Sequence, residues 1–151
     1  MDELWAKAAA RAGLTLDEAL SIDDADPPLY DQLGEAAIKQ FSTHFYARVY
    51  QDEWDEFRDL FKDRPIEQSV QNQFEFLVQR LGGPPVYSER KGPPRLMWRH
   101  AGFPCTNQTA ARWLLHAGEA LDAAPAIAAD PRLRLARFFT FMANLLVVHQ
   151  E

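Results

Sequence analysis

The sequence predicts an all-α protein with one main domain, and three observations support this. Its 151 residues are 47% hydrophobic and 25% charged, the balance of an ordinary globular protein. The longer segments repeat apolar residues at spacings of three and four, which is the period of an amphipathic helix. No segment shows a convincing strand pattern. The helices are too unequal in length for a simple four-helix bundle.

Residues 1–28 are predicted to form an N-terminal helical extension. Asp2 can cap a helix that ends at Gly13, and the residues from Thr15 form a capping box for a second short helix. An Asp-rich segment followed by Pro27 and Pro28 then marks the boundary with the main domain, residues 29–151. We expect a docked helical pair without chemistry of its own, with a lid or a dimer contact as the alternatives.

The main domain should begin with a short turn that ends at Gly34. A long helix is then expected from about Glu35 to Tyr50, with Tyr46 at the edge of its apolar stripe. A buried Tyr46 ring would leave a hydroxyl that needs a partner. Tight helical turns should follow between residues 54 and 61, and Pro65 suits the first turn of the next helix.

The helix expected over residues 65–81 carries a polar side chain within its apolar stripe. Gln73 lies three residues after Val70 and four before Leu77, and Ser69 lies four residues before Gln73. A buried amide must find a hydrogen-bond partner or remain unsatisfied at a cost. Taken alone, the pattern favours a Gln at the rim of the core that reaches water.

Residues 81–103 are expected to form an irregular loop around one imidazole. The segment holds four of the seven glycines and four of the ten prolines, a density that ends one helix before another begins. Its His100 is flanked by Met97, Trp98 and Phe103. A His on an irregular support beside large apolar side chains suits a ligand for a flat, metal-bearing cofactor. A core His bonded to a backbone carbonyl is the alternative.

Two further helices complete the chain. Thr106 or the residue after it can cap a helix to about residue 123, in which Trp113 is the largest apolar-face residue and His116 is expected near the surface. Asp130, followed by a proline, should cap the last helix. His149 lies in its terminal turn, where fraying makes it a poor ligand.

Charge and cysteine content exclude several classes of function. The net charge of −6 argues against nucleic acid, and the scattered Lys and Arg residues form no polybasic patch for a membrane. With no long apolar run and no signal-peptide pattern, a cytoplasmic protein is expected. The lone Cys105 cannot form an internal disulfide, which is compatible with a reducing compartment, and is expected to be a small packing residue.

From Leu29 to the C-terminus the sequence resembles a truncated haemoglobin of group II. The resemblance is carried by the run GGPPVYSERKG, then PRL, then RHAGFP, and finally Trp113, at nearly fixed spacing. Three positions depart from the family pattern. Phe61 stands where many relatives carry Tyr or His, Pro93 replaces a common His, and Gly102 replaces a common Pro, which should alter loop rigidity without removing the cofactor.

The resemblance implies a truncated globin fold, in which two antiparallel helix pairs form a two-over-two sandwich around haem b, here with the extra N-terminal segment. His100 would be the proximal iron ligand. The distal side would hold Tyr46, Phe61, Ser69, Gln73 and Trp113. The resemblance places Tyr87, Lys91 and Arg99 near the propionates and Phe76, Leu77, Met97 and Phe103 against the porphyrin. The polar Tyr46 and Gln73 would then face an iron-bound ligand.

The implied function is the binding of dioxygen and related diatomic gases, NO and CO, for oxygen binding or transport. The alternative is a redox enzyme, peroxidase-like or nitric-oxide-consuming, that needs an external reductant such as a reductase. A haem-free helical interaction domain is the third reading. The expected partners are gases and a reductase, with no nucleic acid or membrane, and the expected assembly is a monomer or homodimer.

Overall fold

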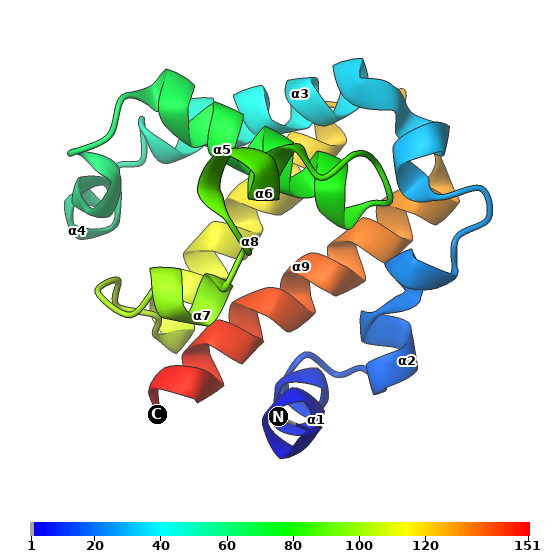
Figure 1. Cartoon of the computed structure of the whole chain (residues 1–151). Helices are drawn as coiled ribbons and strands as arrows, with labels where there is room; N and C mark the ends of the chain where they lie inside the picture. The colour runs from blue at the N-terminus through cyan, green and yellow to red at the C-terminus, as the bar shows by residue number, and fades with distance from the viewer. Residues whose placement is uncertain (1) are drawn as a thin grey trace.

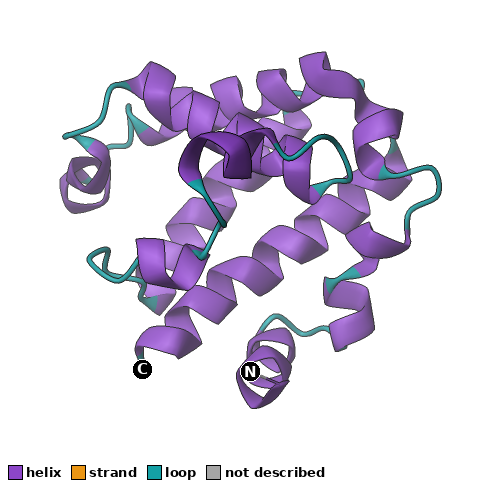
Figure 2. Ribbon diagram, in the orientation of Figure 1, coloured by secondary structure: helices purple, strands orange, loops and turns teal. Residues whose placement is uncertain are grey.

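The computed structural model describes residues 2–151, and within them every regular element is a helix (Figure 2), as the sequence predicted. The α-helices are α1 (Asp2–Arg11), α2 (Leu16–Ala19), α3 (Leu29–Val49), α4 (Asp55–Arg58), α5 (Ile66–Arg80), α6 (Val86–Lys91), α7 (Leu96–Arg99), α8 (Asn107–Asp122) and α9 (Ala129–Gln150). The short 3-10 helices are η1 (Ser21–Asp24) and η2 (Asp59–Phe61). No described helix is both long enough and apolar enough to cross a bilayer.

Four long helices form two antiparallel pairs, the two-over-two arrangement that the resemblance implied. In Figure 1, α3 and α5 run in opposite directions in one layer, and α8 and α9 do so in the other. Their apolar stripes meet in one large core, where Phe41 and Phe139 stack with ring centroids 5.2 Å apart. Phe45 and Phe138 are almost fully buried in the same cluster. The periodicity that predicted each helix therefore also defines its buried face.

The glycines after α5 permit a close approach between α5 and the start of the main domain. A Cβ atom on Gly83 would lie 2.7 Å from a ring carbon of Tyr30, and one on Gly82 would lie 2.7 Å from Cβ of Pro28. Tyr30 also donates its backbone N–H to the carbonyl of Leu81 at 2.9 Å. The predicted turn at residues 29–33 is helical and joins the long helix as α3, with a kink at Gly34, whose φ of 79° suits glycine.

Three local predictions were wrong. The segment 81–103 is not wholly irregular, because it contains the short helices α6 and α7. The last helix begins at Ala129 with Ala128 as its N-cap, so Asp130 lies inside the first turn, where it binds Arg134 at 2.9 Å. His116 is buried rather than near the surface, because its ring stacks on Phe57 and its Nε2 lies against the buried carboxylate of Asp52.

The extension forms two short helices that pack along α9, beside the C-terminal end of the chain (Figure 1). The predicted capping box of α2 is confirmed: the Thr15 hydroxyl accepts from the Glu18 backbone at 3.1 Å, and the Glu18 carboxylate accepts from the Thr15 backbone at 2.9 Å. A small apolar cluster, here called the extension cluster, joins the extension to α9. Its buried members are Ala8, Ala9, Ala19, Phe141, Leu145 and Val148.

Candidate functional site

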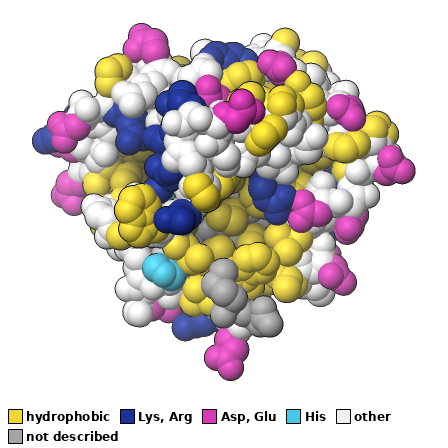
Figure 3. Space-filling model, viewed as in Figure 1, with side chains coloured by type: hydrophobic (Ala, Val, Ile, Leu, Met, Phe, Trp, Pro, Cys, Tyr) yellow, Lys and Arg dark blue, Asp and Glu magenta, His cyan; other side chains and the backbone are white. Residues whose placement is uncertain are grey.

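A cavity of about 650 Å³ lies between the two helix pairs, bordered by α6 and α7. Figure 3 shows a hollow on this face, with hydrophobic side chains in its floor and Lys and Arg side chains along one edge. The structure brings all but one of the predicted site residues to its wall. They are Tyr46, Phe61, Ser69, Gln73, Phe76, Leu77, Tyr87, Lys91, Arg99, His100, Phe103 and Trp113.

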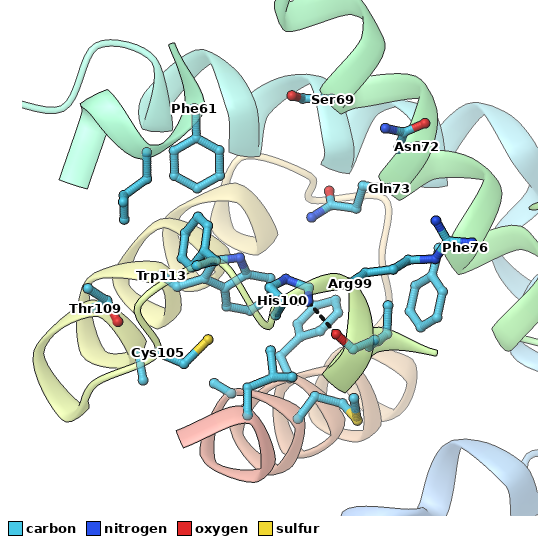
Figure 4. A pocket seen from close by; sticks show the side chains of 18 of the residues that line it. Phe61, Ser69, Asn72, Gln73, Phe76, Arg99, His100, Cys105, Thr109 and Trp113 are labelled. Atoms are coloured by element: carbon cyan, nitrogen blue, oxygen red, sulfur yellow. Dashed lines mark hydrogen bonds between the residues drawn. The ribbon is translucent and has the colours of Figure 1, made fainter. Parts of the chain in front are cut away.

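His100 presents one ring nitrogen to this cavity. It follows α7 directly, and its Nδ1 lies 2.7 Å from the carbonyl oxygen of Leu96, the contact dashed in Figure 4. A carbonyl only accepts, so Nδ1 carries the hydrogen and Nε2 keeps its lone pair. Burial lowers the pKa of His100, which favours the neutral imidazole that a metal needs. A backbone carbonyl on the second nitrogen is the usual support of a metal-binding His.

Three polar side chains from three helices line the same cavity. Tyr46 comes from α3, Gln73 from α5 and Trp113 from α8, and Figure 4 shows the last two extending into the cavity. Within residues 2–151, neither the Tyr46 hydroxyl nor the Trp113 N–H has a hydrogen-bond partner, and Gln73 Oε1 is buried without one. A buried acceptor without a partner is costly, so the position of Gln73 Oε1 beside the Tyr46 and Trp113 donors indicates a ligand that all three can bind.

Aromatic neighbours hold these donors in place. The Tyr46 ring meets Phe45 edge-on at 4.8 Å and Phe61 at 6.2 Å, and the Trp113 ring lies 4.9 Å from Phe45 and 5.6 Å from Phe139. Burial raises the pKa of Tyr46 well above its ordinary value. The Tyr46 hydroxyl therefore stays neutral and remains able to donate a hydrogen bond.

Ser69 lines the cavity, but its hydroxyl hydrogen is engaged elsewhere. The Tyr50 hydroxyl lies 2.7 Å from the Ser69 hydroxyl and donates to the carbonyl of Arg64 at 2.8 Å. Because that carbonyl can only accept, Ser69 must supply the hydrogen of the Ser69–Tyr50 bond. Ser69 can thus accept a hydrogen bond from a ligand but cannot donate one in this arrangement.

One edge of the cavity gathers positive charge. The pKa of Lys91 is lowered, first by its burial and then by the neighbouring cations Arg64, Arg99 and Arg90. Arg64 also lines the cavity, although no motif or spacing in the sequence had selected it. Such crowding of like charges favours an anionic group at this edge. The guanidinium of Arg99 lies over the ring of Tyr87, 5.6 Å from the centroid of that ring.

Arg99 mainly braces the loop that precedes α7. Its guanidinium donates to the carbonyls of Lys91 at 2.6 Å, Pro94 at 2.7 Å and Pro93 at 3.3 Å. Next to this loop, Arg90 donates to Glu75 and to Asn72, each at 2.6 Å. The Asn72 side chain also lines the cavity, with a buried N–H group that has no partner among the described residues.

Met97 is the exception among the predicted site residues. Met97 is absent from the described residues that line the cavity. Its side chain packs instead against the extension cluster. The physical reason is that the extension, which lies outside the resemblance, forms an apolar cluster with α9, and this side chain packs against that cluster. Met142 of α9 lines the cavity and packs against the same cluster.

A buried ionic network behind Trp113 was missed by the sequence reasoning. Asp52, whose side chain is fully buried, accepts from Arg112 at 2.6 and 2.8 Å and lies 2.5 Å from His116 Nε2. The Arg112 guanidinium holds the pKa of Asp52 well below its usual range. His116 in turn stacks on Phe57, with centroids 5.8 Å apart. Asp52 follows α3 and lies far from α8 in sequence, so no local spacing connects it to Arg112 and His116.

The residues fit a haem. The hydrophobic floor suits a porphyrin, the free Nε2 of His100 suits an iron ligand, and the cationic edge around Lys91 and Arg64 suits two propionates. This fit uses polar groups that otherwise lack partners within the described chain.

Comparison with known proteins places this site in a family. The family model of the bacterial-like globins matches residues 28–146, so the chain belongs to that family. The resemblance to group II truncated haemoglobins is thereby confirmed, and globin membership implies a haem cofactor and a gaseous ligand.

Two plant proteins are similar to the whole chain. "Two-on-two hemoglobin-3" from Arabidopsis thaliana is 44% identical over 151 residues, which are 100% of this chain and 85% of the relative. "Group 2 truncated hemoglobin 3-1" from Lotus japonicus is 42% identical over the same length, 89% of its own. Both alignments include the N-terminal extension, whereas the family model begins at residue 28.

Solved bacterial structures share the fold of the main domain. The truncated oxygen-avid haemoglobin from Bacillus subtilis has a TM-score of 0.74 and 32% identity, and covers 80% of this chain and 98% of its own. The haemoglobin from Chloroflexus aurantiacus has the same TM-score and coverage at 37% identity. The truncated globin fold predicted from the sequence is therefore confirmed.

Proposed function

We propose that this protein binds dioxygen and related diatomic gases, NO and CO, at the iron of a haem b held by His100. One observation carries the proposal. Tyr46, Gln73 and Trp113 reach one cavity from three helices with unpartnered polar atoms, and the same cavity receives the free Nε2 of His100. This arrangement offers an imidazole ligand for iron and hydrogen-bonding groups for a small polar molecule.

A haem, when bound, would supply the iron at which a diatomic gas binds and would give dioxygen partial negative charge. Trp113 can only donate a hydrogen bond, so it favours a negatively charged ligand. Tyr46 adds a second donor that burial keeps neutral. Hydrogen bonds to charged groups contribute about 1.5–3 kcal/mol each. The two donors together favour dioxygen over carbon monoxide, which carries less charge.

The cationic edge has a separate task, which is to hold the cofactor. Lys91 and Arg64 are placed to pair with the carboxylates of the propionates. Arg99 supports them indirectly, since its guanidinium is bound to the backbone carbonyls of residues 91, 93 and 94. Tyr87 provides the ring beneath Arg99.

A redox function is the second candidate, and Gln73 favours it. The Gln73 amide combines two donors with an acceptor oxygen that lacks a partner. An acceptor beside two donors suits a ligand that carries a hydrogen of its own, such as hydrogen peroxide. Peroxidase-like or nitric-oxide-consuming turnover would need an external reductant, which a reductase would supply.

The absorption spectrum of the purified protein is the decisive first measurement. A haem spectrum that responds to dioxygen and carbon monoxide is expected. A colourless protein that does not take up added haemin would refute the proposal, and the haem-free interaction domain would remain as the function. Steady-state turnover with hydrogen peroxide or nitric oxide, in the presence of a reductant, separates the redox enzyme from the gas-binding protein.

We also infer a cytoplasmic location. Cys105 is a free thiol that is only partly buried, and burial raises its pKa so that it resists oxidation. A lone free thiol of this kind fits a reducing compartment.

A further inference from the structure

The N-terminal extension packs against the end of α9 that binds the loop after His100, and this arrangement assigns it a task. We propose that α1 and α2 act as a proximal brace, which holds α7 and the loop after it so that His100 keeps one orientation toward the haem. The inference rests on the proposed function in one respect, that His100 is the iron ligand. The brace lies outside the residues that match the globin family model.

The first contact of the brace is Met97. This residue lies in α7, three positions before His100, and packs against the extension cluster instead of lining the cavity. Ala8 and Ala9 on α1 are 0% and 2% exposed in that cluster, so α1 lies close against its neighbours. Because α1 and α9 share this cluster and α7 contacts α9, a movement of α1 would loosen the apolar surface on which Met97 packs.

The second contact runs through the last turn of α9. The Gln150 side chain donates to the carbonyl of His100 at 3.0 Å and to the carbonyl of Phe103 at 2.8 Å. Its Oε1 accepts from the backbone N–H of Cys105 at 2.9 Å. One side chain thus holds three backbone groups of the loop that begins at the predicted iron ligand.

The extension in turn holds this end of α9. The neighbour of Gln150, Glu151, accepts from Arg11 at 2.6 Å and from Lys7 at 3.2 Å, both from α1. Such exposed ion pairs are individually weak. The apolar contact adds to them, because Phe141 and Leu145 of α9 are buried in the extension cluster and the Trp5 ring meets Phe141 at 6.0 Å.

His100 needs this external support because α7 is too short to be rigid by itself. The helix spans four residues, and isolated helices of this length do not persist in water. It is preceded by Arg95, which has a left-handed φ of 42°. Arg99 ties α7 to the preceding loop on one side. On the other side the support comes from Met97 and Gln150, and therefore from the extension and the end of α9.

The test uses full-length protein reconstituted with haem and three variants. A8D places a charge in the extension cluster and should undock α1, M97A removes the apolar contact of α7, and Q150E removes both donors to the loop. Resonance Raman spectroscopy would record the iron–histidine vibration of the ferrous protein and the C–O stretch of its CO complex. Haem transfer to apomyoglobin would report how firmly the cofactor is held.

All three variants should shift or broaden the iron–histidine vibration and leave the C–O stretch unchanged, since the distal donors are untouched. Haem transfer from Q150E should be roughly 5- to 150-fold faster, the equivalent of two ordinary hydrogen bonds of about 0.5–1.5 kcal/mol each. M97L, which keeps the apolar volume, should restore most of the wild-type vibration. H149A is the matched control for Q150E, because it alters an exposed side chain in the same terminal turn.

Wild-type vibrations and wild-type haem transfer in M97A and Q150E would overturn the brace, and so would an A8D variant that shifted only the C–O stretch. If A8D fails to fold, M97A and Q150E still test whether the extension cluster and the end of α9 hold His100. A wild-type protein that binds haem without an iron–histidine vibration would overturn His100 ligation itself, and with it the brace. The two failures can be told apart. If only the brace is wrong, the wild-type protein shows the iron–histidine vibration and the variants leave it unchanged.

Discussion

The substitution Trp113→Phe isolates the contribution of one N–H group to ligand binding. The Trp113 ring lies 4.9 Å from Phe45 and 5.6 Å from Phe139, so a phenyl ring in its place keeps most of the aromatic packing. The indole N–H has no hydrogen-bond partner within the described chain, and its loss therefore leaves no protein group unpaired. Only an interaction with a bound ligand should change.

The expected effect follows from the charge on the ligand. A hydrogen bond to a partly charged group is worth about 1.5–3 kcal/mol. If that bond is broken before the gas escapes, W113F should release dioxygen roughly 10- to 150-fold faster than wild type. Carbon monoxide carries less charge, so its dissociation rate should change much less. Ligand-replacement kinetics in a stopped-flow spectrometer would measure both rates.

Phe139→Leu provides the packing control. Phe139 lines the same cavity and touches Trp113 but offers no hydrogen bond, so F139L should change the two gases by similar factors. An unchanged dioxygen rate in W113F would refute the donor role of Trp113. Equal acceleration of dioxygen and carbon monoxide in W113F would refute it as well, because it would show that Trp113 acts through packing alone.

Four further predictions follow from the same structure. His100→Ala should lose the iron–histidine vibration and most of its haem, and a wild-type ferrous spectrum would contradict the assignment. Because burial raises the pKa of Tyr46, its hydroxyl should stay protonated at pH values above the ordinary tyrosine pKa of about 10. The dioxygen dissociation rate should therefore not change between pH 7 and about pH 10.5. A step in that rate near pH 10 would contradict this prediction. Asp52→Asn should lower the free energy of unfolding in urea by about 1–3 kcal/mol, since it removes the carboxylate that binds the part-exposed Arg112 and the buried His116, and a change below about 0.5 kcal/mol would show that the network contributes little. A chain of residues 29–151 should fold and take up haem. Its melting temperature should be several degrees lower than that of the full-length protein, because the α9 residues of the extension cluster become exposed. Failure to fold would show that the extension is part of the core.

Much of the secondary structure was decided locally, and the sequence therefore predicted it. The apolar stripes that contain Phe41, Phe45 and Phe138 specify long helices whatever those helices pack against. The capping box at Thr15 involves residues only three apart, so it was predicted before the fold was known, whereas at the later helix the sequence predicted a cap at Thr106 or Asn107 and the structure selects Thr106. The Asp130 prediction failed because a cap also depends on where the preceding loop enters the helix.

The sequence also determined which residue types could form the site. His100 on its short support, and the polar Tyr46 and Gln73 on apolar stripes, were visible from spacing and from the resemblance to a family. Spacing assigns a residue to a face of its own helix, but it says nothing about which face of another helix lies opposite.

Only the tertiary structure decided the contacts between elements. The Ser69 hydroxyl gives its hydrogen to Tyr50, Met97 packs on the cluster between the extension and α9, and Asp52 binds Arg112 and His116. Each pairing joins residues from separate elements, and in two of them the partners lie more than forty positions apart. Such contacts are set by how helices pack against one another, because a buried carboxylate or an apolar side chain takes the partner that packing brings within reach. Local periodicity carries no information about that choice.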